Sequence, residues 1–500
     1  MAIITAKALD GSIIKFHDEI FSSGGMKDAH WGHDKTFVVL FFRDKQDYNT
    51  KDRLITITEL YYDRIFNREG GEYWKNLLCW PTKVIEHDGK IGIVAPRYST
   101  HFFFKYGSVN NDMLGIKGQE KEGKWFASAS NQNRFLDSRE RGDWRSYFRI
   151  GILISRAVKR LHSAGLAHSD LSYKNVLVDP AGGNACIIDV DSLVVPSKFP
   201  PDVVGTPDFI APEVMATSSL KLNDKNKNLP NINTDKHALA VLIYMYLLYR
   251  HPLRGGKVHD VNDPQKDEML SMGEKALFVE HPTDKSNRPN LKNIRKSYLP
   301  WADVDKMPYT VCGPYLKELF DRAFIDALHT PHLRPGANEW EIALIKTLDL
   351  MQPCQNKQCS QKWFVFDNTK SPKCPFCGTP YTQQLPILNL YSARTAGKYI
   401  PDNHRIMVYH NQYLYKWHCN RTIFPNERLK QADKVPVGYF VFHQKKWLFV
   451  NQTLTSFQDI TDSNNPVLIA PGSSVELTEG KKLLFSKEQG GRLAVVQIVN

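Results

Sequence analysis

The chain of 500 residues lacks any long apolar run. Its longest one, residues 238–248, is far shorter than the roughly 20 residues that a membrane-spanning helix needs. The opening residues also lack the charged start, the apolar core and the cleavage site of a signal peptide. We therefore expect no membrane segment and a cytoplasmic location.

Blocks of like charge are missing as well, although the net charge is +12. Charges spread in this way indicate a solvated surface, so nucleic-acid binding is not expected, while the basic balance is compatible with acidic partners. The hydrophobic content of 42% is that of a globular protein. The length predicts roughly two to four domains.

Cysteine is scarce: the chain has eight, and half of them form one cluster. Cys354-x4-Cys359 is followed by Cys374-x2-Cys377. Two thiolate pairs at this spacing suit tetrahedral Zn²⁺, so residues 351–384 are predicted to form a structural zinc ribbon that acts as a scaffold or docking module. A disulfide pair is the alternative, which the absence of a secretion signal disfavours.

Three motifs within residues 168–213 indicate the chemistry of this protein. They are HSDLSYKN at 168–175, IIDVD at 187–191 and GTPDFIAPE at 205–213. In this order they resemble the signatures H-R-D-L-x-x-x-N, D-F-G and A-P-E of the protein-kinase superfamily. The resemblance implies an α+β, two-lobed kinase fold, with an N-lobe over residues 1–97 and a C-lobe over 98–350.

The resemblance also implies how the site transfers a phosphoryl group. Asp170 would accept the proton of a substrate hydroxyl, Lys174 would supply a cation, and Asn175 and Asp189 would hold Mg²⁺ or Mn²⁺. Apolar residues 176–178 and 185–188 flank the turn 180–183 and predict a hairpin. That hairpin would set Asn175 and Asp189 side by side.

Several residues depart from the family pattern. Ser169 replaces the arginine that usually grips a phosphorylated activation loop, so switching on through that arginine is not expected. Ser172 stands where serine/threonine kinases carry lysine, but Lys174 follows two positions later. Asp191 is a second candidate for the metal ligand, although Asp189 is favoured because it ends the strand at 187–188.

The expected nucleotide loop is also altered. Only the middle glycine of the family's loop remains, as Gly24, and the lysine position of the strand at 36–44 falls on Phe42. Kinases of the with-no-lysine type carry the lysine at the third glycine position, where Lys27 stands here. We expect Lys27 to reach the α- and β-phosphates, although most lysines are merely solvated. The residues expected to bind ATP are Ser22, Gly24, Gly25, Lys27, Ala95 and Arg97.

The same resemblance assigns positioning roles to other residues. A glutamate of the helix at 51–66 should pair with Lys27; Glu59 is favoured because it lies on an apolar stripe, and Glu72 is the rival. Asp235 would brace the backbone of the catalytic loop. Arg334 would pair with Glu213 of the A-P-E motif.

From Leu385 onward, short strands separated by turns predict an all-β sandwich. Trp447-x-x-x-Asn451 and the later strands are similar to the second half of a forkhead-associated domain. Such domains bind phosphothreonine through loop residues, but the sequence shows no clear G-R or S-x-x-H pattern, so a protein-interaction module is the favoured role. The whole arrangement is similar to bacterial kinases of the tellurite-resistance-associated type. That similarity implies a von Willebrand A-domain protein and a metal-dependent protein phosphatase as partners.

Three functions are compatible with these residues. The first is a protein kinase that uses ATP to phosphorylate Ser or Thr of a partner protein in bacterial stress or metal-resistance signalling. The second is a small-molecule phosphotransferase, which the 205–213 segment, Asp235 and Arg334 disfavour. The third is a nucleotide-binding pseudokinase scaffold, which the altered loop and Phe42 keep open.

Overall fold

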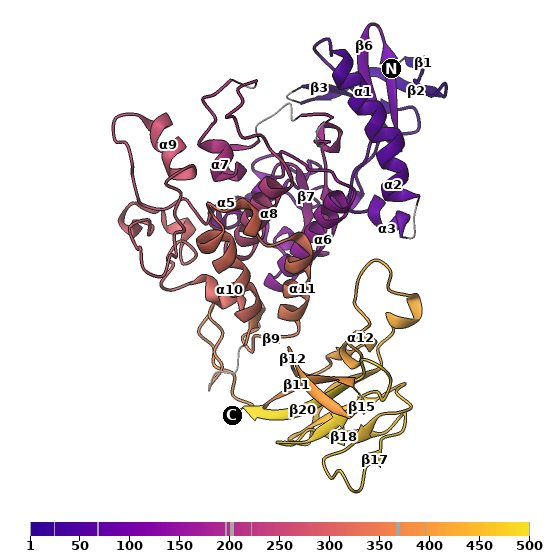
Figure 1. Ribbon diagram of the computed structural model, residues 1–500, viewed down its shortest axis with the longest axis vertical. Coiled ribbons are helices and arrows are strands. Elements are labelled where there is room, and N and C mark those ends of the chain that lie inside the picture. Colours follow the sequence, from indigo (N-terminus) through magenta and orange to yellow (C-terminus); the bar gives the residue numbers. More distant parts are fainter. Residues whose placement is uncertain are drawn as a thin grey trace. The chain divides into compact units, whose positions relative to one another are not determined.

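The structure is a computed structural model and describes residues 2–24, 26–67, 70–195, 198–200, 205–221, 223–366, 371–395 and 397–499. The chain divides into two compact units (Figure 1). The first contains Met1–Gly142, Ser146–Tyr309 and Lys317–Ile342; the second contains Asp143–Arg145, Thr310–Leu316 and Ala343–Asn500. Among the described residues, no helix has both the length and the apolar character needed to cross a membrane.

The first unit begins with a six-stranded antiparallel sheet in the order β1-β2-β3-β4-β6-β5. Its strands are β1 (Ile3–Lys7), β2 (Ile13–Ser23), β3 (Lys27–Gly32), β4 (Phe37–Phe42), β5 (Lys83–His87) and β6 (Lys90–Pro96). Alternate residues of each strand point to opposite faces. One face buries Phe16, Val39 and Ile85, and the other packs Phe42 and Ile93 against a helix.

That helix begins earlier than the sequence predicts and is not uniform. It consists of α1 (Tyr48–Thr56), a π-helical turn η1 (Ile57–Tyr61) and α2 (Tyr62–Phe66). The carboxylate of Asp47 caps the start by accepting a hydrogen bond from the Thr50 amide at 2.8 Å. The π turn adds a residue to the winding, and its buried face is formed by Ile57, Thr58 and Tyr61.

The helical part of the first unit is built around α8 (Ile232–Leu248), whose side chains are almost all buried. A helix that is apolar on all sides belongs in a core. The chain turns out of α8 at Tyr249, which has left-handed backbone angles. The other helices of the chain up to residue 348 are α3 (Gly71–Lys75), α4 (Val109–Asp112), α5 (Ala129–Phe135), α6 (Trp144–Ser163), α7 (Pro212–Met215), α9 (Pro264–Met272), α10 (Pro314–Asp321) and α11 (Ala337–Leu348).

The predicted hairpin is present next to these helices. Strands β7 (Val176–Asp179) and β8 (Asn184–Ile187) are antiparallel, and Val176 faces Ile187. All four side chains of β7 are buried. Asn175 directly precedes β7, and Ile188 and Asp189 follow β8, so the register brings these residues close together. The Ile188 amide donates to the carbonyl oxygen of Asn175 at 3.0 Å.

The second unit holds a small ribbon and a pair of sheets. Strands β9 (Met351–Pro353) and β10 (Trp363–Val365) form the ribbon. The six-stranded sheet has the order β12 (Lys398–Met407), β11 (Leu385–Thr395), β20 (Arg492–Val499), β19 (Lys482–Leu484), β16 (Gln458–Asp459) and β17 (Val467–Leu468). The four-stranded sheet has the order β13 (Tyr413–Leu414), β14 (Gly438–His443), β15 (Lys446–Asn451) and β18 (Ser474–Glu476), and one short helix, α12 (Lys416–Cys419), lies in the same unit.

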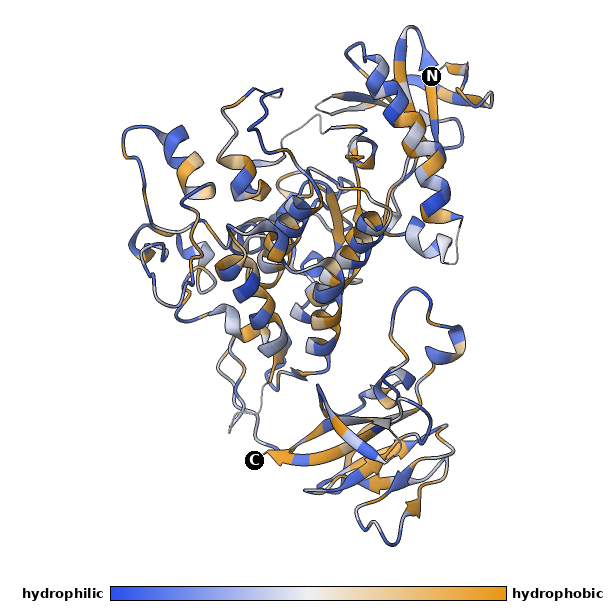
Figure 2. Cartoon of the chain, viewed as in Figure 1, coloured by the Kyte–Doolittle hydropathy of each residue, from blue (hydrophilic) through white to orange (hydrophobic). Residues whose placement is uncertain are grey.

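The two sheets share one buried apolar cluster, which includes Leu388, Phe440, Phe449 and Phe485. Figure 2 shows the corresponding pattern, with hydrophobic residues along the strands and hydrophilic residues in the loops. Asn451, at the end of β15, is fully buried, and its amide donates to the carbonyl oxygens of Leu454 and Ile469 at 2.8 Å each. Asn451 therefore holds the following loop in place and is not presented to a ligand.

Candidate active site

The centre of the site is a loop that precedes β7 and holds Asp170. Both oxygens of this carboxylate are engaged: Oδ2 accepts from the Asn175 amide at 2.9 Å, and Oδ1 accepts from the amide and the hydroxyl of Thr206 at 2.7 and 2.8 Å. These bonds fix the direction of the carboxylate. Thr206 was not singled out from the sequence, although it lies inside the GTPDFIAPE motif.

Asp235, in the first turn of α8, lies beneath this loop. Its carboxylate accepts from the backbone amides of His168 and Ser169 at 2.7 and 3.2 Å, and it also contacts the His162 ring at 3.1 Å. Ser169 has a positive φ of 66°, a conformation that is costly for a residue with a side chain. The buried Asp235 carboxylate helps to hold the backbone in that conformation.

Asp189 and Asp191 follow β8 and lie in different environments. The Asp189 side chain is 52% exposed, whereas that of Asp191 is 5% exposed. Burial raises the pKa of Asp191 above its ordinary value. Burial also acts on Asp189, but the nearby Lys27 ammonium outweighs it and leaves that pKa lowered. Asp189 thus presents a charged, accessible oxygen, while Asp191 faces the interior.

Lys27 reaches this pair of carboxylates from β3. Its Nζ lies 2.5 Å from Oδ2 of Asp191 and 3.2 Å from Oδ1 of Asp189. Burial alone would lower the pKa of Lys27, but the two carboxylates reverse the effect and raise it, so the ammonium stays charged. Lys27 is therefore a buried cation of the site and not a solvated surface lysine.

The position of Lys27 explains how a phenylalanine can occupy the usual lysine position of β4. Lys27 and Phe42 are direct partners in the β3–β4 ladder. Cross-strand partners project from the same face of a sheet, and Nζ of Lys27 lies 5.1 Å from the centre of the Phe42 ring. The ammonium therefore enters the same region that a lysine at position 42 would reach.

The expected partner of Lys27 on the helix is not found. Glu59 is exposed, and among the described residues it forms no ion pair with Lys27. The π turn of η1 buries Ile57, Thr58 and Tyr61 and leaves Glu59 facing solvent. Glu72 is also not the partner, because it pairs with Lys75 at 2.5 Å on the surface. Asp191 takes the place of a helix glutamate.

The remaining residues expected to bind ATP lie around the sheet. Ser22 is exposed in β2, and the Gly24 amide donates to the Lys27 carbonyl at 2.9 Å, which closes the turn between β2 and β3. Gly25 lies outside the described residues. Ala95 is buried in β6, and the guanidinium of Arg97 stacks over the Trp31 ring at 5.2 Å. Lys174 is exposed beside the catalytic loop.

The oxygens at the site suit a hard divalent cation. Asn175 donates its amide nitrogen to Asp170, which leaves its Oδ1 as an acceptor, and Asp189 contributes an exposed carboxylate. Mg²⁺ and Mn²⁺ prefer such oxygen ligands and share them with substrate phosphates. The residues present fit a metal ion that is bound together with a nucleotide.

Arg334 and Glu213 join the segment after the site to the helical core. The guanidinium donates to both carboxylate oxygens at 2.8 and 2.7 Å, and also to the carbonyls of Asn233 and Leu328. The Arg334 side chain is only 1% exposed. A buried, bidentate pair of this kind is strongly destabilising to break, because one charge is left without a partner.

We expect Arg334→Ala to lower the free energy of unfolding of the first unit by about 3–5 kcal/mol. The matched control is Arg322→Ala, which removes a half-exposed pair with Glu339 and should cost less than about 1 kcal/mol. Urea denaturation followed by tryptophan fluorescence measures both. Equal losses of unfolding free energy in the two variants would show that the buried pair stabilises the fold no more than the exposed pair does.

The four clustered cysteines lie in the ribbon of the second unit. Their Sγ atoms are all within 4.8 Å of one another, with Cys354 and Cys377 3.5 Å apart and Cys359 and Cys374 4.0 Å apart. All four are free thiols, so the disulfide alternative is not formed. Four thiolates around Zn²⁺ would be separated by about 3.8 Å, given Zn–S bonds of about 2.3 Å. The cluster therefore fits a tetrahedral metal ion.

Comparisons with known proteins agree with the geometry of the first unit. Residues 128–338 match the family model described as protein kinase domain. Serine/threonine-protein kinase PSK2 of Saccharomyces cerevisiae is 32% identical over 146 residues, which are 28% of this chain and 12% of that protein. Serine/threonine-protein kinase dkf-1 of Caenorhabditis elegans is 34% identical over 166 residues, which are 32% of this chain and 18% of that protein. Citron Rho-interacting kinase of Homo sapiens is 30% identical over 107 residues, which are 20% of this chain and 5% of that protein.

By this match, residues 128–338 form a protein kinase domain. The matched segment contains the catalytic loop, Asp189, the 205–213 motif, α8 and Arg334, but it begins after the sheet that carries Lys27. The chain spans less than a fifth of the length of each of these three relatives.

Proposed function

We propose that the chain is an ATP-dependent protein kinase that transfers the γ-phosphoryl group to a Ser or Thr hydroxyl of a partner protein. One observation carries the proposal: Lys27 from the sheet and Asp189 from the end of β8 meet within 3.2 Å. Asp170 and Asn175 lie on the adjoining loop, bonded to each other at 2.9 Å. A cation and three oxygen-bearing side chains in this arrangement can position and neutralise a triphosphate.

Each residue has a defined task in this proposal. Lys27 contacts the α- and β-phosphates, and Asp191 holds its ammonium in the site. Asn175 and Asp189 hold Mg²⁺ or Mn²⁺, which supplies neutralisation of the phosphate charge when bound. Asp170, fixed by Thr206 and Asn175, accepts the hydroxyl proton of the substrate, and Lys174 contributes a further cation near the transferred group. Ser22, Gly24, Ala95 and Arg97 complete the nucleotide site.

The second unit extends the proposal beyond catalysis. Residues 351–384 would be a four-cysteine zinc ribbon, and residues 385–500 a forkhead-associated-like sandwich that contacts other proteins without reading phosphate. Burial of Asn451 supports the absence of phosphopeptide binding. We further propose a bacterial, cytoplasmic signalling system of the tellurite-resistance type, with a von Willebrand A-domain protein and a metal-dependent protein phosphatase as partners.

A nucleotide-binding pseudokinase scaffold is the second candidate. The observation in its favour is that Lys27 pairs with Asp191 and Asp189 instead of a helix glutamate. In that case the ammonium would stay with the carboxylates when nucleotide binds, and no transfer would follow.

Radiolabelled ATP decides between the two functions. Wild-type protein with Mg²⁺ or Mn²⁺ is expected to label itself or a partner protein, and Asp170→Ala should lower the rate by about a hundredfold, because a general base typically contributes a factor of this size. Glu59→Ala is the matched control and should keep its activity, since Glu59 is exposed and unpaired with Lys27. Nucleotide binding without transfer by the wild type would favour the scaffold.

A further inference from the structure

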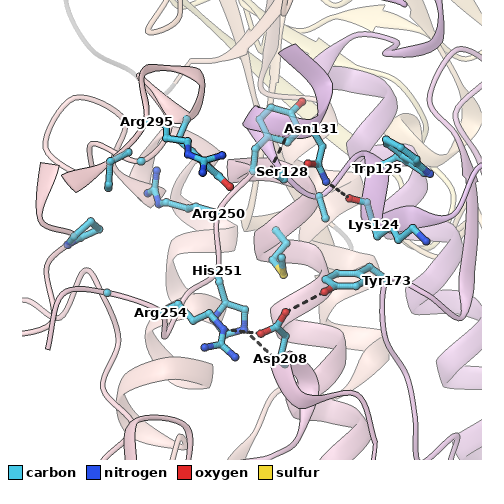
Figure 3. A pocket seen from close by; sticks show the side chains of 18 of the residues that line it. Lys124, Trp125, Ser128, Asn131, Tyr173, Asp208, Arg250, His251, Arg254 and Arg295 are labelled. Carbon is cyan, nitrogen blue, oxygen red and sulfur yellow. Dashed lines mark hydrogen bonds and ion pairs between the residues drawn. The ribbon is translucent and has the colours of Figure 1, made fainter. Parts of the chain in front are cut away.

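A pocket of about 1040 Å³ lies in the first unit beside the loop that carries Asp170 (Figure 3). Tyr173 and Lys174, which follow Asp170 by three and four positions, form part of its lining. Asp208, two residues after the Thr206 that binds Asp170, also lines it. A protein segment whose hydroxyl lies at Asp170 would therefore enter this pocket within a few residues, at about 3.3 Å per extended residue.

Part of the pocket lining is apolar. It includes Trp125, Phe135, Met245 and Tyr249, and the last two lie at the end of α8. Its volume lies at the upper end of the range of about 300–1,000 Å³ for ligand pockets, which leaves room for several side chains of a peptide. Large apolar side chains would be the natural occupants of the apolar part.

The charged groups of the pocket are predominantly basic. Five lining residues are cations, and Asp208 is the single carboxylate among the lining residues. Arg254 contacts Asp208 at 2.5 Å, and the Tyr173 hydroxyl donates to the same carboxylate at 3.0 Å, so Asp208 is already engaged. Burial lowers the pKa of His251 to about 4, and this ring is therefore neutral at pH 7. The cations are Lys124, Lys174, Arg250, Arg254 and Arg295.

These cations differ in how far they are neutralised. Arg250 pairs with the buried Glu280 at 2.5 Å, and Arg254 also pairs with Glu268 at 2.6 Å. Lys174 and Arg295 are exposed, and neither is ion-paired within the part of the chain that the structure describes. Figure 3 shows Arg295 on the wall opposite Lys124 and Trp125. The pocket thus presents uncompensated positive charge next to apolar lining residues.

The geometry points to a substrate protein whose segment next to the phosphorylated Ser or Thr carries an acidic residue and a large apolar residue, the acidic one facing Lys174 and Arg295. This inference rests on the proposed kinase function and adds a substrate class to it. A segment rich in arginine or lysine would meet cations with no available carboxylate and would be disfavoured by like-charge repulsion.

A peptide library with a central Ser or Thr and randomised flanks tests the inference on the full-length protein with radiolabelled ATP. We expect enrichment of Asp or Glu together with large apolar residues. For the best acidic peptide, Arg295→Glu should raise KM about fivefold or more with little change in kcat, as expected for a lost charge contact outside the reacting groups. The same variant should gain activity toward the peptide in which Lys replaces the acidic residue, which a merely structural role would not produce.

Lys292→Glu is the matched control, because Lys292 is an exposed cation of the same segment but does not line the pocket. Lys292→Glu should leave KM and kcat for both peptides unchanged. A preference for basic flanks, no preference, labelling confined to the protein itself, or an Arg295→Glu variant without the charge-dependent change would each overturn the inference while leaving the kinase proposal standing. Absence of any transfer by the wild type would overturn both.

Discussion

Replacement of Lys27 by methionine is expected to lower the phosphoryl-transfer rate by about a thousandfold, because removal of one preorganised charge donor from a dry site typically costs about 10²–10³ in rate. The Lys27 side chain is only 14% exposed and its ammonium lies 2.5 and 3.2 Å from Asp191 and Asp189, so water screens its charge only weakly. Methionine keeps most of the length of the side chain and removes the ammonium with its charge and hydrogen bonds. Single-turnover transfer from radiolabelled ATP measures the effect.

Two neighbouring cations serve as controls for Lys27. Arg43 follows β4 and donates to the carbonyl of Gly24, and Lys45 is exposed two residues later. Arg43→Met and Lys45→Met should retain most of the activity, because neither side chain reaches Asp189 or Asp191. If either residue proved essential while Lys27 was dispensable, the assignment of the phosphate-binding lysine would be wrong.

A variant that moves the positive charge from residue 27 to residue 42 tests the role of Lys27 more directly. Lys27 and Phe42 are partners across the β3–β4 ladder, so the double variant Lys27→Met with Phe42→Lys moves the ammonium to the other strand of the same face. We expect this variant to recover part of the transfer rate that Lys27→Met loses. No recovery in a folded double variant would show that the ammonium is required at residue 27 itself.

Loss of Zn²⁺ is expected to unfold the ribbon at residues 351–384. Binding to four thiolates contributes about 10–16 kcal/mol in small zinc domains, and a ribbon with two short strands has little apolar core to replace it. Cys374→Ser, which alters a fully buried ligand, should abolish stoichiometric zinc in elemental analysis and expose the ribbon to proteolysis. A chelator that withdraws the metal from the wild type should produce the same cleavage.

Cys419→Ser is the control for the zinc prediction. Cys419 is also buried in the second unit, but it lies in the apolar cluster of the sheets and not among the four clustered thiols. This variant should keep one zinc per chain. A wild-type protein that binds no zinc with all four thiols reduced would contradict the proposed metal site.

Local patterns were sufficient for much of this protein. The motif order from His168 to Glu213 was readable because each motif is a short run of residues with a fixed chemistry. The β7–β8 hairpin followed from two short apolar runs that flank a turn. The four-cysteine cluster was predicted from spacing alone, since two pairs of thiols on tight turns are already close to the geometry of a metal site.

Other features were set by contacts between distant parts of the chain. Glu59 lies on an apolar stripe in the sequence, but a π turn rotates it to the surface, and no local pattern of the sequence marked that turn. Thr206 binds Asp170 across 36 positions, and the basic pocket gathers residues from Lys124 to Arg295. Such arrangements depend on how segments pack, which the periodicity of one segment does not encode.

The sequence by itself determined which candidate functional groups the chain possesses: the carboxylates at 170 and 189, the amide at 175, the lysine at 27 and the four thiols of the ribbon. Only the tertiary structure decided how the lysine is held, because its partner Asp191 lies 164 positions away and meets it through the packing of β3 against the loop after β8. The physical reason is that residue chemistry and periodicity are properties of short segments. The partner of a buried charge depends instead on long-range packing and on the cost of removing the charge from water.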